Sequence, residues 1–314
     1  MTRIHLDTDI GGDTDDLCAL AMVLGWPGAE LAAVTTTGDQ SGLRAECVRF
    51  ALRLAGGDNI PVAAGANGSL SGYRVYPTIP ALDRYWPDVA VPPASPPGAA
   101  LDLLAESAEA GAVIVAIGPW TNLALLEIAR PGLLARTRVV AMGGYVEAPG
   151  PGLPQWGPDM DYNVQQDTIA ARIVWERCNA LLVPLTVGLE VALRAEHLPA
   201  LRPANPLARL VAAQGKMHGT DDDMFGLGRA HQRLPDDLLN FHYDPLACAV
   251  ALDWDGVSVE ELHLSARMES NILAFPRDAN GKRTRVAVAV DGPRFEAEWL
   301  AAVAGDAVRR KTAS

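Results

Sequence analysis

The sequence predicts an α/β fold in which a mostly parallel central sheet is flanked by helices. Apolar runs of strand length alternate with segments whose apolar residues recur every three or four positions. Apolar residues make up 49% of the 314 positions, which is enough for a sizeable core. Because alternating strands and helices are typical of a parallel sheet covered on both faces, we expect one domain spanning residues 1–314.

The expected elements follow one another in chain order. Apolar runs and helical periods first predict a strand at 4–10, a helix at 15–25, a strand at 31–37, a helix at 43–55 and a strand at 61–64. The alternation resumes with helices at 101–110, 121–129 and 168–177 and strands at 112–117, 138–142 and 180–187. Beyond residue 187 the alternation becomes less regular, with short helical segments and a polar loop at 219–234. A helix at 245–252, strands at 262–269 and 285–290 and a helix at 293–303 complete the expected elements.

Residues 66–98 form the longest stretch without periodicity and are rich in Pro, Gly and Tyr. Loops of this length inside a domain are usually functional, so the segment is expected to be a lid or a binding loop. Its aromatic side chains either line a lid or anchor the loop to the body, and the sequence leaves both alternatives open: Tyr73, Tyr76, Tyr85 and Trp86.

Composition narrows the class of partner. Lys and Arg number 26 and Asp and Glu number 38, so the formal charge is −12, which disfavours nucleic acids and anionic membranes. The four cysteines are far apart among apolar residues, which is typical of buried thiols in a reducing compartment. Without a signal-like start or about 20 consecutive apolar residues, a cytoplasmic protein that does not enter the membrane is expected.

The segment Asp7-Thr8-Asp9-Ile10-Gly11-Gly12-Asp13-Thr14-Asp15-Asp16 carries five carboxylates in ten residues. Asp7 and Asp9 are two apart on a strand and therefore share one side. Asp15 and Asp16 fall in the first turn of a helix, whose dipole favours negative charge. Capping accounts for one or two of these acids, whereas five repel one another and suit an oxygen-liganded cation. The segment therefore predicts a metal site.

This segment resembles the opening motif of the inosine-uridine-preferring nucleoside hydrolases, and further motifs follow in family order. They are Thr35-Thr36-Thr37-Gly38-Asp39, Ile60-Pro61-Val62-Ala63-Ala64-Gly65-Ala66, Gly118-Pro119-Trp120-Thr121-Asn122-Leu123-Ala124, Met142-Gly143-Gly144, Asp161-Tyr162-Asn163 and Asp244-Pro245. The resemblance runs from residue 4 to about residue 255. It implies a Rossmann-like core and a calcium-dependent hydrolase of purine or pyrimidine salvage, which cleaves the N-glycosidic bond of a ribonucleoside or related riboside to base and sugar.

The resemblance also implies roles for single residues. Asp9, Asp16 and Asp244 would bind Ca²⁺ through their carboxylates and Thr121 through its carbonyl, with Asp9 also taking a proton from the attacking water. The substrate would contact Asp15, Asp39, Met142, Gln155, Asp161 and Asn163. Arg229 would reach the base if residues 219–234 close over it, the alternative being a solvated loop. Relatives commonly form homodimers or homotetramers, and the same is expected here.

Asp39, Gln155 and Asp161 stand where the family usually has Asn, Asn and Glu, so the ribonucleoside preference is the weakest part of the resemblance.

The leaving base is the point where the sequence departs from purine-active members. These have a His directly before the Asp-Pro pair, whereas this chain has Tyr243 there and His242 one position earlier. A shift of one residue in a helix of about 3.6 residues per turn rotates a side chain by about 100°. Tyr243 is thus expected to face the base better than His242, either donating to it or packing against it, and activity on inosine is expected to be weak.

Two alternatives compete with this interpretation. Haloacid-dehalogenase phosphatases begin with Asp-x-Asp at a strand end, which Asp7 and Asp9 match, although Gly11 stands where Thr or Val is expected. The other alternative is a protein that binds a riboside without cleaving it.

Overall fold

The computed structural model describes residues 1–305 apart from 40, 73, 88, 90–94 and 97. Its centre is an eight-stranded sheet in which all neighbours pair in parallel except the last two. In spatial order the strands are β3 (Val62–Ala64), β2 (Ala29–Thr36), β1 (Thr2–Thr8), β4 (Val113–Ala116), β5 (Val139–Met142), β6 (Leu181–Val183), β12 (Lys282–Val290) and β9 (Val257–Leu264). The predicted fold class is confirmed.

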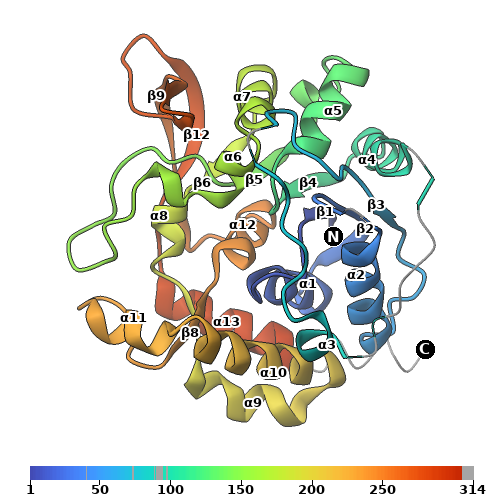
Figure 1. The fold of residues 1–314 in the computed structure, drawn as a ribbon, viewed down its shortest axis with the longest axis vertical. Coiled ribbons are helices and arrows are strands. Elements are labelled where there is room, and N and C mark those ends of the chain that lie inside the picture. The colour runs from blue at the N-terminus through green and yellow to red at the C-terminus, as the bar shows by residue number, and fades with distance from the viewer. Residues whose placement is uncertain (40, 73, 88, 90–94, 97, 306–314) are drawn as a thin grey trace.

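Helices cover both faces of the sheet (Figure 1). One face carries α1 (Asp15–Gly25), α2 (Leu43–Leu54), α12 (Tyr243–Ala251) and α13 (Gly292–Ala304); the other carries α4 (Ala99–Glu109), α5 (Thr121–Ala129) and α7 (Thr168–Arg177). Strand side chains alternate between the two cores, so that Val115 of β4 packs with α1 and α12 while its neighbour Ile114 packs with α4 and α5. Burial on both faces explains why these strands are continuously apolar.

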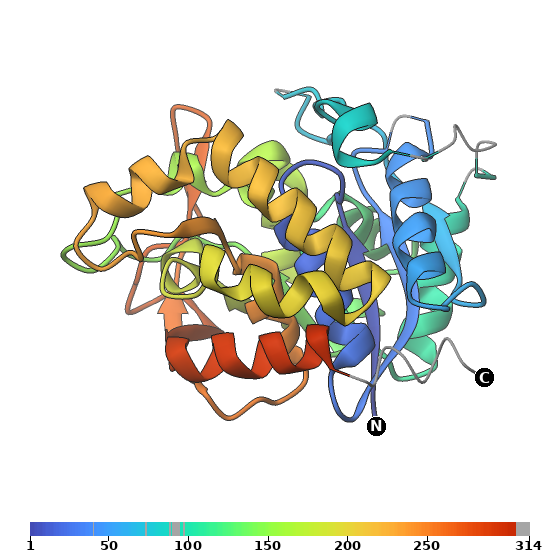
Figure 2. The same cartoon turned by 90° about the horizontal axis from the view of Figure 1, so that it is seen from below.

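A further layer lies outside α1. Figure 2 shows α9 (Leu198–Ala204), α10 (Pro206–Asp221) and α13 running alongside one another. α10 packs against β8 (Leu238–Phe241), which pairs with β7 (Ala192–Arg194) in a small antiparallel sheet. Gly215 and Gly219 make this contact close, because a Cβ added at either would lie under 3 Å from Leu193 or Leu239.

The strand order reverses between β1 and β4. From β1 the chain proceeds to β2 and β3 on one side, and from β4 it proceeds to β5 and β6 on the other. Ligands of such sheets bind outside the carboxyl ends of the strands at this reversal. Gly118 follows β4 there, and a Cβ on it would lie 2.8 Å from the backbone nitrogen of Asp9, so only glycine allows the two loops to approach this closely.

The structure corrects several expected elements. The strand expected at 180–187 ends at Val183, and Pro184 leads into the short helix α8 (Leu185–Gly188). The loop expected at 219–234 is largely helical: α10 continues to Asp221, and α11 (Met224–Ala230) follows with Asp223 as its N-cap. The strand expected at 262–269 is instead the end of β9 and the separate β10 (Arg267–Glu269), which pairs with β11 (Ile272–Ala274).

Shorter elements complete the chain: the helices α3 (Leu82–Tyr85) and α6 (Tyr162–Gln166), and 3₁₀ turns at Leu134–Arg136, Pro158–Met160 and Ala195–His197. The cysteines Cys18, Cys47, Cys178 and Cys248 are free thiols, and all four are buried. Among the described residues, no helix has the length and apolar character needed to cross a bilayer.

A row of buried polar side chains crosses β1 beneath the carboxyl end of the sheet. His5 Nδ1 lies 2.8 Å from Ser107 Oγ and its Nε2 lies 3.0 Å from Thr35 Oγ1. Thr35 donates to Asp7 Oδ1 at 2.5 Å, and Asn122 Nδ2 donates to the same oxygen at 2.8 Å. Burial lowers the pKa of His5 to about 3 and raises that of Asp7 to about 7. The His5 imidazole is therefore uncharged at neutral pH, whereas the Asp7 carboxyl takes up a proton more readily than an exposed aspartate.

The buried imidazole predicts a pH dependence of stability. Unfolded His5 titrates near 6.5 but folded His5 near 3, so between these values the unfolded chain binds one more proton. The stabilisation is complete above pH 6.5 and is lost as pH falls, by up to about 1.4 kcal/mol per pH unit. Urea unfolding at pH 7.5, 6 and 5 should therefore show a shallower loss of unfolding free energy for His5→Gln than for wild type. His263→Gln, at an exposed strand position, is the control, and parallel curves for His5→Gln and wild type would contradict the assignment.

Candidate active site

A cavity of about 600 Å³ opens at the reversal point of the sheet. Seven carboxylates line it. Asp221 and Asp222 lie at its mouth, and the other five form a cluster, four from the segment between β1 and the first turn of α1 and one from the first turn of α12: Asp9, Asp13, Asp15, Asp16 and Asp244. Oxygens of Asp13, Asp15 and Asp16 lie within 4.8 Å of one another. The parallel sheet brings residue 244 to the N-terminal acids because α12 packs against both α1 and the strands β4 and β5.

Local hydrogen bonds fix the orientation of these acids. Asp15 N–H donates to Asp13 Oδ1 at 3.1 Å, and Asp16 N–H donates to Asp15 Oδ1 at 3.0 Å. The Thr8 hydroxyl donates to Asp16 Oδ1. The N-terminal turn of α1 therefore presents its acids to the cavity with oxygens still available for a ligand.

The cluster carries more negative charge than its surroundings compensate. Burial raises the pKa of Asp9 to about 6, although the Arg44 charge opposes the rise. Burial raises the pKa of Asp15, Asp16 and Asp244 well above the usual value, and the neighbouring carboxylates add to it. Oxygen donors at this density are the ligand set of a hard divalent cation, whose charge would reverse these shifts.

Asp13 differs from its neighbours. Burial opposes its charge, but hydrogen bonding with Asp15 and the charge of His218 outweigh this and lower its pKa below the usual value. Asp13 is therefore the acid of the cluster that stays ionised most readily.

Arg44 places a buried guanidinium beside the acids. It is the second residue of α2, is 3% exposed and lines the cavity. Its nitrogens donate to four backbone carbonyls rather than to a carboxylate: those of Gly38 (3.1 Å), Asp9, Ile10 (2.9 Å) and Pro77 (3.1 Å). One side chain thus holds the turn after β1, the end of β2 and the loop before α3 together.

Part of the loop at 66–98 forms a wall of the cavity, which it lines with Pro77, Thr78, Pro80, Ala81 and Tyr85. The described stretch before these residues is attached to the body near the base of the cavity. Asp167 accepts the N–H groups of Leu70 (2.7 Å) and Ser71 (3.1 Å) and the hydroxyl of Thr121 (2.7 Å). The Tyr76 hydroxyl hydrogen-bonds Thr121 Oγ1 at 2.6 Å. These partners are buried, so the first part of the loop is fixed.

The same loop meets α10 at the mouth of the cavity. Tyr85 OH donates to Asp221 Oδ2 at 2.8 Å, and Arg84 pairs with the same carboxylate. Buried Gln214 donates to the Tyr85 carbonyl at 2.7 Å. Tyr85 lines the cavity while Tyr76 and Trp86 are anchored in the core, so the aromatic residues divide between the two expected roles. Tyr73 lies outside the described residues.

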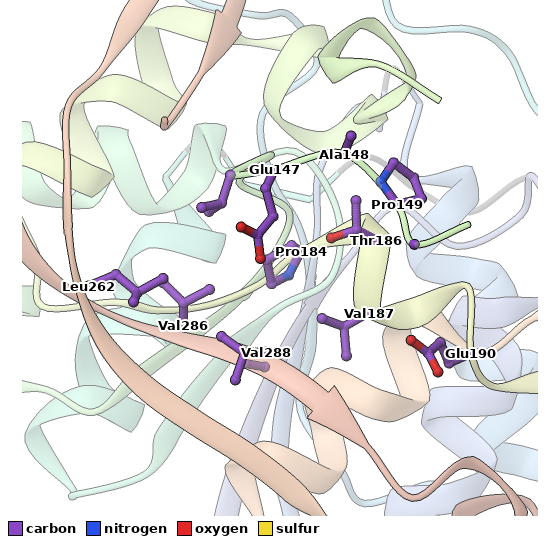
Figure 3. A pocket seen from close by; sticks show the side chains of 13 residues that line it. Glu147, Ala148, Pro149, Pro184, Thr186, Val187, Glu190, Leu262, Val286 and Val288 are labelled. Atoms are coloured by element: carbon purple, nitrogen blue, oxygen red, sulfur yellow. The ribbon is translucent and has the colours of Figure 1, made fainter. Parts of the chain in front are cut away.

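A separate, smaller cavity of about 100 Å³ lies on the other side of α8 (Figure 3). Leu185 faces the large cavity, whereas Thr186 and Val187 face the small one. Glu147 and Glu190 are its acidic residues, and aliphatic side chains of β9 and β12 form its floor. No residue lines both this small cavity and the large cavity that contains the carboxylate cluster.

Comparison with known proteins identifies the family. The model of the inosine-uridine preferring nucleoside hydrolases matches residues 4–297. The chain belongs to this family of nucleoside hydrolases. It is accordingly an enzyme of the N-glycosidase class, and the resemblance to haloacid-dehalogenase phosphatases does not extend beyond the first motif.

Relatives and solved structures agree with this assignment. The pyrimidine-specific ribonucleoside hydrolase RihA of Klebsiella pneumoniae is 32% identical over 228 residues, covering 67% of this chain and 68% of that protein. The plant nucleoside hydrolase PpNRh1 has the same fold, with a TM-score of 0.77 at 20% identity over 97% of this chain and 99% of its own. The purine-preferring ribonucleoside hydrolase of Gardnerella vaginalis gives a TM-score of 0.75 at 23% identity, covering 98% of this chain and 100% of its own.

Seven of the residues predicted for the nucleoside hydrolase site line the large cavity: Asp9, Asp15, Asp16, Met142, Asn163, Tyr243 and Asp244. Asn163 donates to the Ile117 carbonyl at 2.9 Å and contacts Met142 Sδ at 3.2 Å. These contacts place the amide between the ends of β4 and β5.

Thr121 is not among them. It begins α5, where its carbonyl belongs to the helix and its hydroxyl is bonded to Asp167 and Tyr76. The residue of this turn that lines the cavity is Ile117, directly after β4, whose carbonyl is held by Asn163. The structure thus places Thr121 outside the lining of the cavity and Ile117 within it.

Asp39 and Asp161 serve as helix caps instead of lining the cavity. Asp39 accepts the N–H groups of Arg44 (3.1 Å) and Ala45 (2.9 Å) at the start of α2. Asp161 accepts N–H groups from Gly144 (2.7 Å), Tyr145 and Val164 and is fully buried. Both carboxylates are therefore occupied as hydrogen-bond acceptors for backbone N–H groups.

Gln155, Arg229 and His242 also point elsewhere. Gln155 is exposed and donates to carbonyls of its own loop, and Arg229 is exposed on α11. His242 is fully buried, with its ring 4.2 Å from that of Trp299, and does not line the cavity. Tyr243 does line it, with its ring against Gly188, where a Cβ would lie 2.3 Å from Tyr243 Cδ1.

Three cavity residues had no role in the sequence analysis: Arg44, Ile117 and Asn240. Asp13 belonged to the acid-rich segment expected to bind a metal, and His218 to the region expected either to close over the base or to be a solvated loop. Arg44 had a detectable signal, since a cation in the first turn of a helix opposes the helix dipole and needs another reason to be there. Ile117 had no such signal in the sequence, because every residue type carries a backbone carbonyl.

Arg44 predicts a large stability effect. Arg44→Met should lower the free energy of unfolding by at least about 3 kcal/mol, because four carbonyls lose their donor and the acids lose their nearby cation. Arg49→Met, on the same helix but half-exposed and paired with Glu46, should cost about 1 kcal/mol or less. Equal effects in urea unfolding would show that Arg44 is an ordinary helix residue.

Proposed function

We propose that this chain hydrolyses the N-glycosidic bond of ribonucleosides with Ca²⁺ bound by the carboxylate cluster and with Asp9 accepting a proton from the attacking water. The observation that carries the proposal is the convergence of five carboxylates in one cavity beside a single buried guanidinium. Such a cluster is unfavourable in an empty protein and suits an oxygen-liganded divalent cation.

The residues that would hold the cation are Asp9, Asp16, Asp244 and the carbonyl of Ile117, which replaces Thr121 in the expected set. All four line the cavity and come from three segments that meet at the strand reversal. When bound, the cation supplies positive charge that orients sugar hydroxyls and acidifies a water molecule. Asp9 lines the cavity beside the Gly118 loop, and its position among the proposed ligands supports its assignment as the group that takes the proton.

The remaining lining suits a sugar and a planar base. Asp15 and Asn163 offer an acceptor and an amide to ribose hydroxyls. The leaving-group side is aromatic: Trp156 and Phe241 have ring centroids 5.9 Å apart, and those of Phe241 and Tyr243 are 5.2 Å apart. Cleavage builds positive charge on the sugar, and the neighbouring carboxylates stabilise it. Because RihA is named pyrimidine-specific, uridine and cytidine belong in the substrate panel beside inosine.

Calcium should stabilise the fold. The melting temperature should rise with added Ca²⁺, by an amount equivalent to about 2.7 kcal/mol at a hundredfold excess over Kd. Asp244→Asn should abolish most of this shift because it removes a ligand, whereas Asp58→Asn, at an exposed position, should keep it. The metal assignment fails if calorimetry detects no Ca²⁺ binding to the wild type.

Turnover tests the reaction itself. With Ca²⁺ present, uridine, cytidine or inosine should yield free ribose and base, and Asp9→Asn should lower kcat by about 10²–10⁴-fold because the base is lost. Circular dichroism should show an unchanged fold. Tight riboside binding without sugar release by the wild type would instead favour a non-catalytic binder, and activity of Asp9→Asn within tenfold of wild type would exclude Asp9 as the base.

A further inference from the structure

Departure of a nucleobase requires a proton, and the two side chains expected to supply it are badly suited. His242 is packed against Trp299 and Phe295 behind the cavity, and neither ring nitrogen has a partner among the described residues. The phenol of a tyrosine, with an ordinary pKa of about 10, is a poor acid at neutral pH. The Tyr243 ring packs against Gly188 and lies 5.2 Å from that of Phe241, so it serves as an aromatic wall of the cavity.

His218 is the imidazole that lines the cavity. It lies in the last turn of α10 and is 8% exposed. Its Nδ1 is 2.6 Å from Asp222 Oδ2, one helical turn further on. A carboxylate at this distance accepts the Nδ1 proton and fixes the ring, so that Nε2 is the nitrogen left to face a ligand.

Three acidic groups surround the His218 ring. Asp221 is the last residue of α10 and Asp222 is its C-cap, and Asp13 faces His218 from the loop after β1. Tyr85 of α3 shares the cavity mouth through its bond to Asp221. The charge of His218 lowers the pKa of both Asp13 and Asp221, which shows that the ring is close enough to interact with them.

Asn240 marks the same part of the cavity as a binding position. It is 3% exposed and lines the cavity from β8, against which α10 packs. Its Oδ1 accepts Phe241 N–H at 2.9 Å, and a hydrogen bond from its side chain helps to lower the pKa of Asp13, so the amide lies beside an acid that interacts with His218. The adjoining rings of Phe241 and Tyr243 offer flat faces to a base.

We propose that His218, oriented by Asp222, donates the proton to the departing base. This proposal rests on the ribonucleoside hydrolase activity proposed above. As the bond between the anomeric carbon and the base nitrogen breaks, its electron pair goes to the base, which takes the Nε2 proton. Water adds its oxygen to the anomeric carbon and gives a proton to Asp9. Exchange with solvent then reprotonates His218 and deprotonates Asp9, so that one water is consumed for each base and sugar released.

The test compares leaving groups that need a proton with one that does not. His218→Gln should lower kcat on uridine and inosine by about 10²-fold or more, but leave hydrolysis of 4-nitrophenyl riboside within about threefold of wild type, since nitrophenolate departs without protonation. His231→Gln is the matched control, because that ring caps α11 by bonding the Leu227 carbonyl and does not line the cavity. Asp222→Asn should show a smaller loss with the same selectivity.

Other outcomes overturn the proposal. Equal losses of His218→Gln on both kinds of substrate would assign His218 a structural or binding role, and unchanged nucleoside turnover would assign it none. Retained activity on 4-nitrophenyl riboside is itself the check that the variant is folded. A wild-type enzyme that hydrolyses neither substrate would overturn the proposed function. If the wild type hydrolyses both substrates, a variant without the expected selectivity counts against His218 as the proton donor and not against the proposed function.

Discussion

Repulsion among buried carboxylates is the constraint around which this structure is organised. Four acids in eight residues, with Asp244 added from α12, occupy the point where the order of the parallel strands reverses. Helix dipoles and N–H groups at the starts of α1 and α12 favour this charge but do not neutralise it. The surrounding architecture therefore serves two needs, which are to hold the acids together and to leave their free oxygens turned toward one cavity.

Arg44 meets part of that need in an unusual way. Its charge acts on Asp9 and Asp16, yet its hydrogen bonds go to carbonyls of three different segments. A carboxylate–guanidinium pair would have consumed an acid oxygen, whereas bonding to carbonyls leaves the acids available. The cation thus stabilises the cluster electrostatically and fixes the backbone that carries it, without competing for its ligands.

Patterns that depend on side-chain type and period were predictable from the sequence, and those that depend on orientation were not. The bounds of α1, α5 and α7 follow directly from apolar period, and the acid cluster follows from crowding at a strand end. Asp39 and Asp161 show the limit, because an acid near a strand end serves equally well as a ligand or as a helix cap, and only the position of the next helix decides. The three aspartates at 221–223 likewise look like a loop, although Asp223 in fact starts a helix. The placement of a backbone carbonyl such as that of Ile117, which we propose as a ligand, depends on where a strand ends, and composition does not record this.

The described part of the loop at 66–98 is attached to the body in two places. Near the base, N–H groups of Leu70 and Ser71 bond to buried Asp167. At the mouth, Tyr85 is held by buried Gln214, and the neighbouring ion pair of Arg84 with Asp221 is exposed, with side chains 50% and 34% accessible. Exposed ion pairs contribute about 0–1 kcal/mol and weaken with salt, while buried bonds are neither weak nor screened. Raising the ionic strength consequently weakens the contact between Arg84 and Asp221 at the mouth, while the hydrogen bonds of the same loop to Asp167 and Gln214 are left unaltered.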